Sequence, residues 1–334
     1  MTIQNAQETR LIDEMESILQ EKMELDYIEG STMRDAHPKC LGLAKANFTV
    51  ATDIPTHLQV GVFKTPKTYK SWIRFSNASG QVKSDKEKDF RGLAIKLLGV
   101  TGERFNDNEQ QTQDFLLMSH STMPLGTVKL FRDAVYYSIK WNPLILVMKL
   151  LLTGKVSVLK TMKIGKKNDA SLLDLNYWST TPYAFGNNKV KYKIVPTSAS
   201  KSQLPAKLTD DYLTKNMNEQ LQHGSATFDF YIQEFKDEHT TPIEDAAVEW
   251  SEQHSPFIKV AQIEIQEQAI DSKERFDLAE VFSFSPANAL LDHKPIGGLN
   301  RARIRIYNNL SRFRHARNAK SQIEPALINY DLTE

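Results

Sequence analysis

A tyrosine near the C-terminal end of the chain has the most distinctive chemical surroundings. In the segment 297–314, Arg303 precedes Tyr307 by four residues and Arg314 follows it by seven. At roughly 100° per residue in a helix, the three side chains fall within about 40° of one another. A phenol is protonated in water at neutral pH, but a nearby guanidinium and a metal ion both favour its anion. The arrangement is the one a tyrosinate would need, although it also fits a tyrosine packed at the edge of a core.

A second candidate is a histidine in a loop-like segment close to the N-terminus. Arg34 and His37 precede Pro38, whose ring biases His37 toward an extended conformation. A lone histidine in a loop is ordinarily solvated or hydrogen-bonded as part of the structure. The segment therefore gains a chemical interpretation only from what surrounds it in the sequence.

The tyrosine requires a helix to hold it. Two glycines and Pro295 precede Asn300, so we expect Asn300 to be the N-cap of a helix that begins near Arg301. Apolar residues flank the face that carries the tyrosine, namely Ile304, Ile306 and Phe313. The opposite face is basic, and we expect it to be solvated: it carries Arg301, Arg305 and Arg312.

The rest of the chain alternates between short strands and a few helices. We expect strands at 46–52, 58–64, 71–76, 89–96, 113–119, 189–195, 225–235 and 257–265, and helices at 7–26, 127–139 and 206–222. In the third strand, alternation places Trp72, Arg74 and Ser76 on one face and Ile73 and Phe75 on the other. Several strands in close succession predict an antiparallel barrel or a strongly bent sheet.

Composition sets modest limits on function. The chain has 334 residues, of which 40% are hydrophobic and 25% charged, as is ordinary for a soluble globular protein. A formal net charge of +1 gives no argument for a nucleic-acid partner. The single cysteine, Cys40, excludes an intrachain disulfide and a cysteine-based zinc or iron–sulfur site. The polar, acidic N-terminal segment does not resemble a signal peptide, so we expect a cytoplasmic location.

Four motifs, in one order along the chain, resemble those of the haem catalases. They are Arg34-x-x-His37, Arg74-Phe75-Ser76, Asp89-x-Arg91-Gly92-x-Ala94-x-Lys96 and Arg303-x-x-x-Tyr307. The short chain resembles the small catalase-related subgroup, the catalase-like peroxidases, to which the stretches 177–183, 242–246 and 293–298 are also similar. From the residues alone, Asp89 and Arg91 are expected to form a structural pair or turn clamp.

The resemblance implies an α+β fold, in which a catalase-like antiparallel β-barrel core is surrounded by α-helices. It also implies haem b, buried between the barrel and the C-terminal helix. A haem domain at 30–320 would follow an N-terminal helical segment at 1–29. The remainder, 321–334, would be a C-terminal tail, which we expect to be poorly ordered.

The same resemblance implies roles for individual residues. Tyr307 matches the axial ligand of the haem iron, and Arg303 matches the arginine that keeps this phenolate ionised. The haem propionates would pair with Arg34, Arg74 and Arg314. His37 matches the acid–base residue on the opposite side of the haem, with Ser76 orienting it. The implied function is a haem-dependent peroxidase or catalase-like oxidoreductase that cleaves the O–O bond of hydrogen peroxide or organic hydroperoxides, with an electron donor as partner.

One departure from the catalase pattern concerns the residue above the haem. Catalases carry an asparagine after the Asp-x-Arg-Gly element, whereas here the stretch 118–124 contains none. Ser119 or His120 could donate a hydrogen bond instead. The departure weakens the case for dismutation, which handles two peroxides in sequence, more than the case for chemistry on one peroxide.

An apolar run at 144–152 is the least catalase-like part of the chain. It is too short to span a bilayer, which takes about 20 residues. Lysines follow it at positions 155, 160, 163, 166 and 167. The region 144–167 fits a buried helix with a solvated basic tail, and it also fits an interfacial segment that contacts lipid or admits a fatty hydroperoxide.

Three other functions are compatible with the same residues. The first is dehydration or isomerisation of a lipid hydroperoxide on the same haem fold, without an external reductant. The second is a non-catalytic haem-binding or sensing protein, and the third is a lipid-binding module without haem. The oligomeric state is open, and a homo-oligomer is one alternative.

Overall fold

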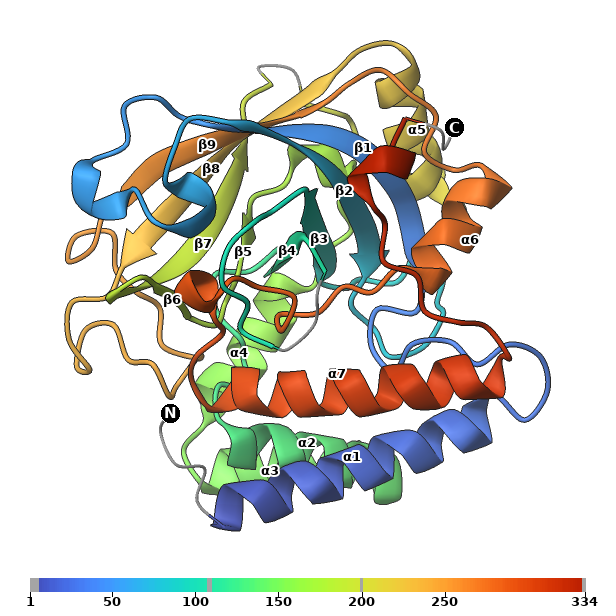
Figure 1. The fold of residues 1–334 in the computed structure, drawn as a ribbon. Coiled ribbons are helices and arrows are strands. Elements are labelled where there is room, and N and C mark those ends of the chain that lie inside the picture. Colours follow the sequence, from blue (N-terminus) through green and yellow to red (C-terminus); the bar gives the residue numbers. More distant parts are fainter. Residues whose placement is uncertain (1–5, 107–109, 199–200, 332–334) are drawn as a thin grey trace.

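The centre of the molecule is a closed antiparallel sheet (Figure 1). The computed structural model describes residues 6–106, 110–198 and 201–331. The strands are β1 (Cys40–Val50), β2 (Thr68–Asn77), β3 (Arg91–Leu98), β4 (Thr112–Met118), β5 (Tyr177–Trp178), β6 (Tyr183–Phe185), β7 (Asn188–Pro196), β8 (Ala226–Glu234) and β9 (Phe257–Ile265). Their order is β5-β4-β3-β2-β1-β9-β8-β7-β6. Because β5 also pairs with β7, eight strands close into a barrel and β6 lies beside β7.

Helices surround this barrel (Figure 1). They are α1 (Ala6–Asp26), α2 (Val128–Lys140), α3 (Pro143–Leu152), α4 (Val156–Gly165), α5 (Tyr212–Gln222), α6 (Lys273–Val281) and α7 (Gly298–Arg317). Single 3₁₀ turns occur at η1 (Thr56–Leu58), η2 (Gly61–Phe63), η3 (Leu172–Asp174), η4 (Leu291–His293) and η5 (Leu327–Asn329). In Figure 1, α7 runs beneath the barrel, and α1 and α2 lie beneath α7. The predicted α+β barrel with surrounding helices is confirmed.

The barrel interior is filled by aromatic side chains. The ring of Phe230 lies 5.0 Å from that of Phe115, 5.1 Å from that of Phe48 and 5.5 Å from that of Tyr192. All four residues are fully buried. Side chains that point into a closed barrel are surrounded by one another on every side, so they pack closely. The interior is therefore a packed core rather than a channel.

A second apolar layer joins three helices outside the barrel. On α1, Ile12, Met15 and Met23 pack in one cluster with α7, which contributes Ile306 and Leu310. The basic face of α7 also meets this helix, since Arg301 pairs bidentately with Glu8 and Arg305 pairs with Asp13 and Glu16. These two arginines are therefore not simply solvated, as their position on the helix suggested.

Residues 58–64 do not form the expected strand. They contain the end of the turn η1 and the whole of η2, and Gly61 adopts a positive φ of 53°, which interrupts an extended chain. A Cβ atom at Gly61 would lie 2.3 Å from Nε2 of His293, so only glycine allows this approach. The amide of Val62 then donates a hydrogen bond to that nitrogen at 3.1 Å.

The C-terminal segment is better packed than expected. Tyr330 is 5% exposed, and its hydroxyl donates to the carbonyls of Ala46 and Ser71 at 3.2 and 3.1 Å. Glu324 pairs with the buried Lys96 at 2.9 Å. The last three residues, 332–334, lie outside the described part of the chain.

Among the described residues, no helix combines the length and apolar character needed to cross a membrane.

Candidate functional site

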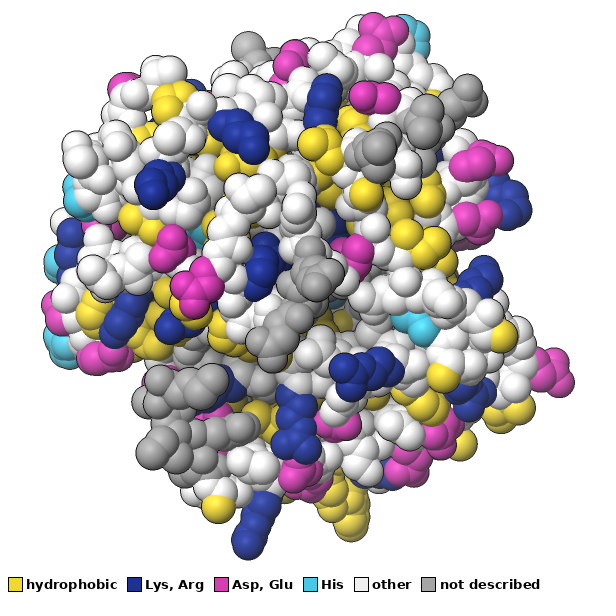
Figure 2. Space-filling model, in the orientation of Figure 1, with side chains coloured by type: hydrophobic (Ala, Val, Ile, Leu, Met, Phe, Trp, Pro, Cys, Tyr) yellow, Lys and Arg dark blue, Asp and Glu magenta, His cyan; other side chains and the backbone are white. Residues whose placement is uncertain are grey.

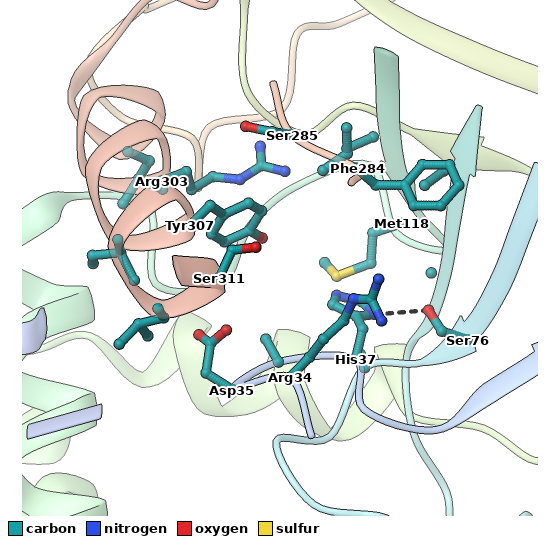
Figure 3. A pocket seen from close by; sticks show the side chains of 18 of the residues that line it. Arg34, Asp35, His37, Ser76, Met118, Phe284, Ser285, Arg303, Tyr307 and Ser311 are labelled. Carbon is teal, nitrogen blue, oxygen red and sulfur yellow. Dashed lines mark hydrogen bonds between the residues drawn. The ribbon is translucent and has the colours of Figure 1, made fainter. Parts of the chain in front are cut away.

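A cavity of about 770 Å³ lies between α7 and the outer face of the barrel strands. The outward-facing residues of β2, β3 and β4 form one wall and α7 forms another. Figure 3 shows Arg303, Tyr307 and Ser311 on the α7 side, with His37, Ser76 and Met118 facing them. The alternation predicted for β2 accounts for this wall, because Arg74 and Ser76 line the cavity whereas Ile73 and Phe75 point into the barrel.

On the α7 side, the predicted tyrosine and arginine lie together. The guanidinium of Arg303 sits over the ring of Tyr307, 5.5 Å from its centroid. The same guanidinium donates hydrogen bonds of 3.1 Å to the hydroxyl of Thr181 and to the side-chain carbonyl of Asn300. Burial works to lower the pKa of Arg303, but the nearby Tyr307 and Tyr183 hold it above its usual value.

Asn300 does not cap the helix, contrary to the prediction. The N-cap is Gly297, whose φ of 84° is unfavourable for other residues, and α7 begins at Gly298. The carboxylate of Glu244 accepts the amide of Gly298 at 2.8 Å and stabilises the helix N-terminus. Asn300 lies inside the first turn, where its amide donates to the carbonyl of Pro182 at 2.8 Å. Its role is to hold the guanidinium of Arg303.

On the barrel side, His37 lies against two strands. Its Nδ1 is 3.0 Å from the hydroxyl of Ser76, an interaction drawn as a dashed line in Figure 3. A Cβ atom on Gly92 would lie 2.6 Å from this ring and 2.7 Å from the Ser76 hydroxyl. Gly92 therefore leaves the space that the histidine occupies. The backbone of His37 adopts a φ of 56°, an uncommon conformation for a residue with a side chain.

The histidine is held in its neutral form. Burial, followed by the positive charges of Arg74 and Arg303, lowers the pKa of His37 to about 4. A neutral imidazole at pH 7 accepts a proton, as a general base must. Because Nδ1 is engaged by Ser76, Nε2 is the nitrogen left for a substrate.

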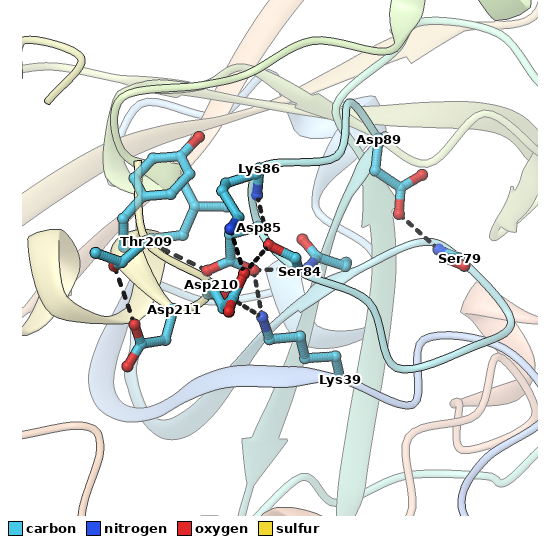
Figure 4. A network of polar contacts seen from close by, with 12 residues as sticks. Lys39, Ser79, Ser84, Asp85, Lys86, Asp89, Thr209, Asp210 and Asp211 are labelled. Carbon is cyan, nitrogen blue, oxygen red and sulfur yellow. Dashed lines mark hydrogen bonds and ion pairs between the residues drawn. The ribbon is translucent and has the colours of Figure 1, made fainter. Parts of the chain in front are cut away.

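A polar network around a buried carboxylate holds the two segments that carry His37 and Ser76 (Figure 4). Asp85 is fully buried, and its Oδ1 accepts from Lys39 at 2.6 Å and from Asn77 at 2.9 Å. Lys39 follows His37 by two residues, and Asn77 directly follows Ser76. One carboxylate therefore ties together the two segments that carry the hydrogen-bonded pair.

Three arginines meet at one end of the cavity around a single carboxylate. Glu280 lies 3.1 Å from Arg34, 3.1 Å from Arg314 and 4.0 Å from Arg74. Burial, followed by the neighbouring charge of Arg74, lowers the pKa of Arg34 to about 9. Asp35 lies beside the cluster, but burial raises the pKa of its carboxyl and favours its neutral form. The cluster therefore carries an excess of positive charge.

This charge pattern fits a group that brings two carboxylates into the cavity. Nε of Arg74 is buried without a hydrogen-bond partner in the part of the chain that the structure describes. A buried donor of this kind is costly unless a ligand satisfies it. The propionates of haem are two adjacent carboxylates, and haem also needs an apolar pocket and an axial ligand. The residues present provide each of these features.

Neither Ser119 nor His120 lines the cavity. The hydroxyl of Ser119 accepts the amide of Arg91 at 2.9 Å, so it serves the strand pairing. The ring of His120 packs edge-on against Phe90, and its Nδ1 contacts Thr122. Met118 instead presents its thioether to the cavity near His37 (Figure 3). The proposed replacement of the missing asparagine by either polar residue is therefore wrong.

The Asp-x-Arg-Gly segment holds its loop through separate contacts. Arg91 is fully buried and pairs with Asp169 at 3.1 Å, whereas Asp89 accepts the amides of Ser79 and Phe90. The two residues are structural, as expected, but they do not pair with each other.

Several residues of the site escaped the sequence analysis. Glu280 pairs with the three arginines and lies on α6. The sequence around it contains no motif that points to a role in the site. Thr181 lies within a stretch noted for its similarity to catalase relatives, and Asn300 was assigned another role. Met118 could have been found, since it shares the outward face of β4 with Leu116.

Of three comparisons with known proteins, only the one with solved structures gives matches. No family model matches the chain, and no curated protein matches it. Among solved structures, a fungal catalase superposes with a TM-score of 0.67 at 18% identity, over 94% of this chain and 63% of that one. A bacterial catalase gives 0.69 at 17% identity, over 92% and 63%. Catalase A from Saccharomyces cerevisiae gives 0.69 at 18% identity, over 91% and 67%.

These three similarities concern the fold. The chain spans about two thirds of the length of each of these catalases, and identities of 17–18% do not carry an activity from one protein to another. The barrel, the layer of helices and the cavity between them nevertheless form one arrangement across nearly the whole chain. The protein therefore has the fold of the catalases.

Proposed function

We propose that the chain binds haem b in the cavity between α7 and the barrel and uses it to cleave the O–O bond of a peroxide. Tyr307 would be the axial ligand of the iron, and Arg303 would keep its phenolate ionised. The propionates would pair with Arg34, Arg74 and Arg314. Bound haem would supply redox chemistry at its iron.

One observation carries this proposal. A tyrosine with a fixed guanidinium against its ring lies on one wall of the cavity, and a neutral histidine lies on the facing wall. A packed core tyrosine would need neither the partner arginine nor the opposing base. The excess positive charge at the cavity end supports haem in particular, because this cofactor brings two carboxylates.

The residues of the chain would handle the proton of the reaction. His37, neutral at pH 7, would take the proton from one peroxide oxygen through Nε2 and return it to the oxygen that leaves. Ser76 would keep the ring oriented through Nδ1. With an electron donor that supplies two electrons and two protons overall, a hydroperoxide becomes an alcohol and water.

The cavity favours organic hydroperoxides over hydrogen peroxide as substrates. Much of its wall is apolar, with side chains from α1 and α2 such as Met15, Leu19 and Phe131. Beside His37, the thioether of Met118 offers no strong hydrogen-bond donor for a second small, polar peroxide. Turnover of a fatty-acid hydroperoxide should exceed that of hydrogen peroxide under the same conditions, and the reverse order would contradict this substrate class.

Visible absorption of the purified, haem-loaded protein tests the proposal directly. Tyr307→Phe removes the oxygen ligand and should bleach or shift the haem bands. Tyr231→Phe, a matched change on the partly exposed face of β8, should leave them unchanged. If Tyr307→Phe leaves the spectrum unaltered, the ligand lies elsewhere and the proposal fails.

Two measurements separate the proposal from its rivals. Steady-state oxidation of an electron donor distinguishes a peroxidase from an enzyme that dehydrates or isomerises a lipid hydroperoxide without a reductant. A haem-binding or sensing protein would show haem bands that peroxide does not change.

A further inference from the structure

The helical hairpin α3–α4 exposes an unusual amount of apolar surface. Seven of the fourteen large hydrophobic side chains that are exposed among the described residues lie between Trp141 and Ile164. On α3, Leu144, Met148, Leu151 and Leu152 are 66, 61, 52 and 84% exposed. Contiguous exposed apolar surface of this kind marks an interaction site on a soluble protein.

These residues follow the geometry of a helix with two apolar faces. Leu144, Met148 and Leu151 recur at intervals of four and three residues and form one exposed stripe. Leu146 and Leu150 face the other way and pack with α2 and α4. The buried face secures the helix to the protein, so the exposed stripe is not needed for the core. We define the exposed stripe together with Trp141 and Leu152 as the α3 surface.

The charges around the α3 surface have one sign. Between residues 134 and 168 the sequence contains seven lysines and no aspartate or glutamate, although the whole chain carries a net charge of only +1. Two of these lysines pair with acidic residues of neighbouring helices, namely Lys140 with Glu21 and Lys149 with Asp133. On α4 and its flanks, Lys155, Lys160, Lys163 and Lys166 are exposed and have no ion-pair partner in the described ranges.

We propose that the α3 surface and these four lysines dock on the face of an anionic lipid bilayer. Apolar side chains of such a helix enter the headgroup boundary while lysines contact lipid phosphates. No described helix could cross the membrane, so the contact involves one leaflet. In Figure 2, hydrophobic and basic side chains project from the lower edge of the molecule, where Figure 1 places α1, α2 and α3.

A second copy of the chain fits this surface less well. A twofold dimer would place the same lysine-rich region against itself, with no acidic residue in the segment to compensate. An anionic bilayer complements both the apolar stripe and the lysines. Docking there would also bring the cavity close to lipid, because Met162 and Lys166 of the α4 region line its wall. The proposal stands on the surface and does not depend on haem.

Flotation of the full-length protein with vesicles tests the proposal. The protein should float with vesicles that contain phosphatidylglycerol and remain behind with pure phosphatidylcholine vesicles. Each lysine near an anionic surface strengthens binding roughly fivefold, so the combined variant K155Q/K160Q/K163Q should bind about a hundredfold more weakly. The matched variant K64Q/K201Q/K207Q removes three exposed lysines from other parts of the surface and should bind like the unmodified protein.

Apolar insertion is measured independently of charge. The combined variant L144S/M148S/L152S should lose binding, whereas L25S/L204S, which alters exposed leucines elsewhere, should retain it. Trp141 is 64% exposed, so its fluorescence should shift to the blue on anionic vesicles, and Trp141→Phe should remove that shift.

Three results would overturn the proposal. The protein could remain unbound with anionic vesicles, or the control variants could weaken binding as much as the test variants. The protein alone could instead form a dimer in light scattering that L144S/M148S/L152S dissociates, which would show that a second copy covers this surface. The haem spectrum of the same variants reports separately on the proposed function.

Discussion

The barrel interior and the cavity outside it are built from the same strands but filled with different chemistry. Along β2, Ile73 and Phe75 enter a continuous apolar cluster, while Arg74 and Ser76, on the opposite face, line the cavity. The interior is held by close packing of rings. The outer wall holds buried charge and a histidine in an uncommon backbone conformation.

This difference separates stability from chemistry. Apolar burial stabilises the fold wherever it occurs, whereas buried arginines and a neutral histidine are unfavourable without partners. The interior should therefore control the free energy of unfolding, and the outer wall should control cofactor binding and turnover. Substitutions on either side of the sheet test this division.

The largest expected effect is on turnover when the histidine of the outer wall is replaced. His37→Asn removes the imidazole, and asparagine tolerates the positive φ at this position. Loss of general acid–base catalysis should lower peroxide turnover by about 10²–10⁴-fold. Denaturant unfolding should give nearly the same free energy as for the unmodified protein. Turnover within a few-fold of normal would remove His37 from the proposed chemistry.

Replacing an interior ring should have the opposite consequence. Phe230→Ala removes a side chain that contacts three other phenylalanines and Tyr192. The free energy of unfolding should fall by about 3–5 kcal/mol, as for other buried phenylalanines. The neighbouring change Tyr231→Phe should have little effect, because Tyr231 is only partly buried. A loss from Phe230→Ala no greater than that of this control would contradict the assignment of stability to the interior.

Acid should lower the free energy of unfolding through two buried histidines, His37 in the cavity wall and His293 beside the barrel interior. The pKa of His37 is lowered to about 4 by burial and nearby arginines, and that of His293 to about 3 by burial among aromatic rings. The unfolded chain takes up these protons near pH 6.5, so the free energy of unfolding should fall as the pH drops from 6.5 toward 4. Unfolding measured across this range should show a shallower slope in His293→Gln. An unchanged slope would show that His293 does not contribute.

The smallest effect is expected at the hydroxyl that orients the histidine. Ser76→Ala removes a hydrogen bond worth about 1 kcal/mol, so turnover should fall by roughly fivefold. Ser71→Ala removes a comparable hydrogen bond in the same strand, from Ser71 to the carbonyl of Ala46. Steady-state turnover should respond to the first change and not to the second. Equal responses would mean that Ser76 acts through stability alone.

Local patterns predicted much of the scaffold. Helical periodicity placed Arg303 beside Tyr307, and alternation placed Arg74 and Ser76 on one face of a strand. Both inferences depend only on the repeat of a single element, so no tertiary information was needed. The N-terminal end of β1 was not predicted, because Leu41 to Ala44 are buried on both faces and show no alternation.

Other features depended on contacts that no local pattern reveals. Residues 58–64 read as a strand, but the approach of His293 to Gly61 bends them into turns. Asn300 was predicted to be the N-cap of the C-terminal helix, because asparagine is a common N-cap residue. Glu244, distant in sequence, caps the helix in its place and leaves Asn300 to hold Arg303.

The sequence by itself determined a succession of strands typical of an antiparallel barrel or a strongly bent sheet, and the pairing of a tyrosine with an arginine on one helix, because both follow from short-range periodicity. Only the tertiary structure decided that Glu280 joins three arginines and that Met118 rather than Ser119 or His120 borders the cavity. These relations join segments separated by tens to hundreds of residues. They depend on how the barrel closes and where α7 packs against it, which no single segment encodes.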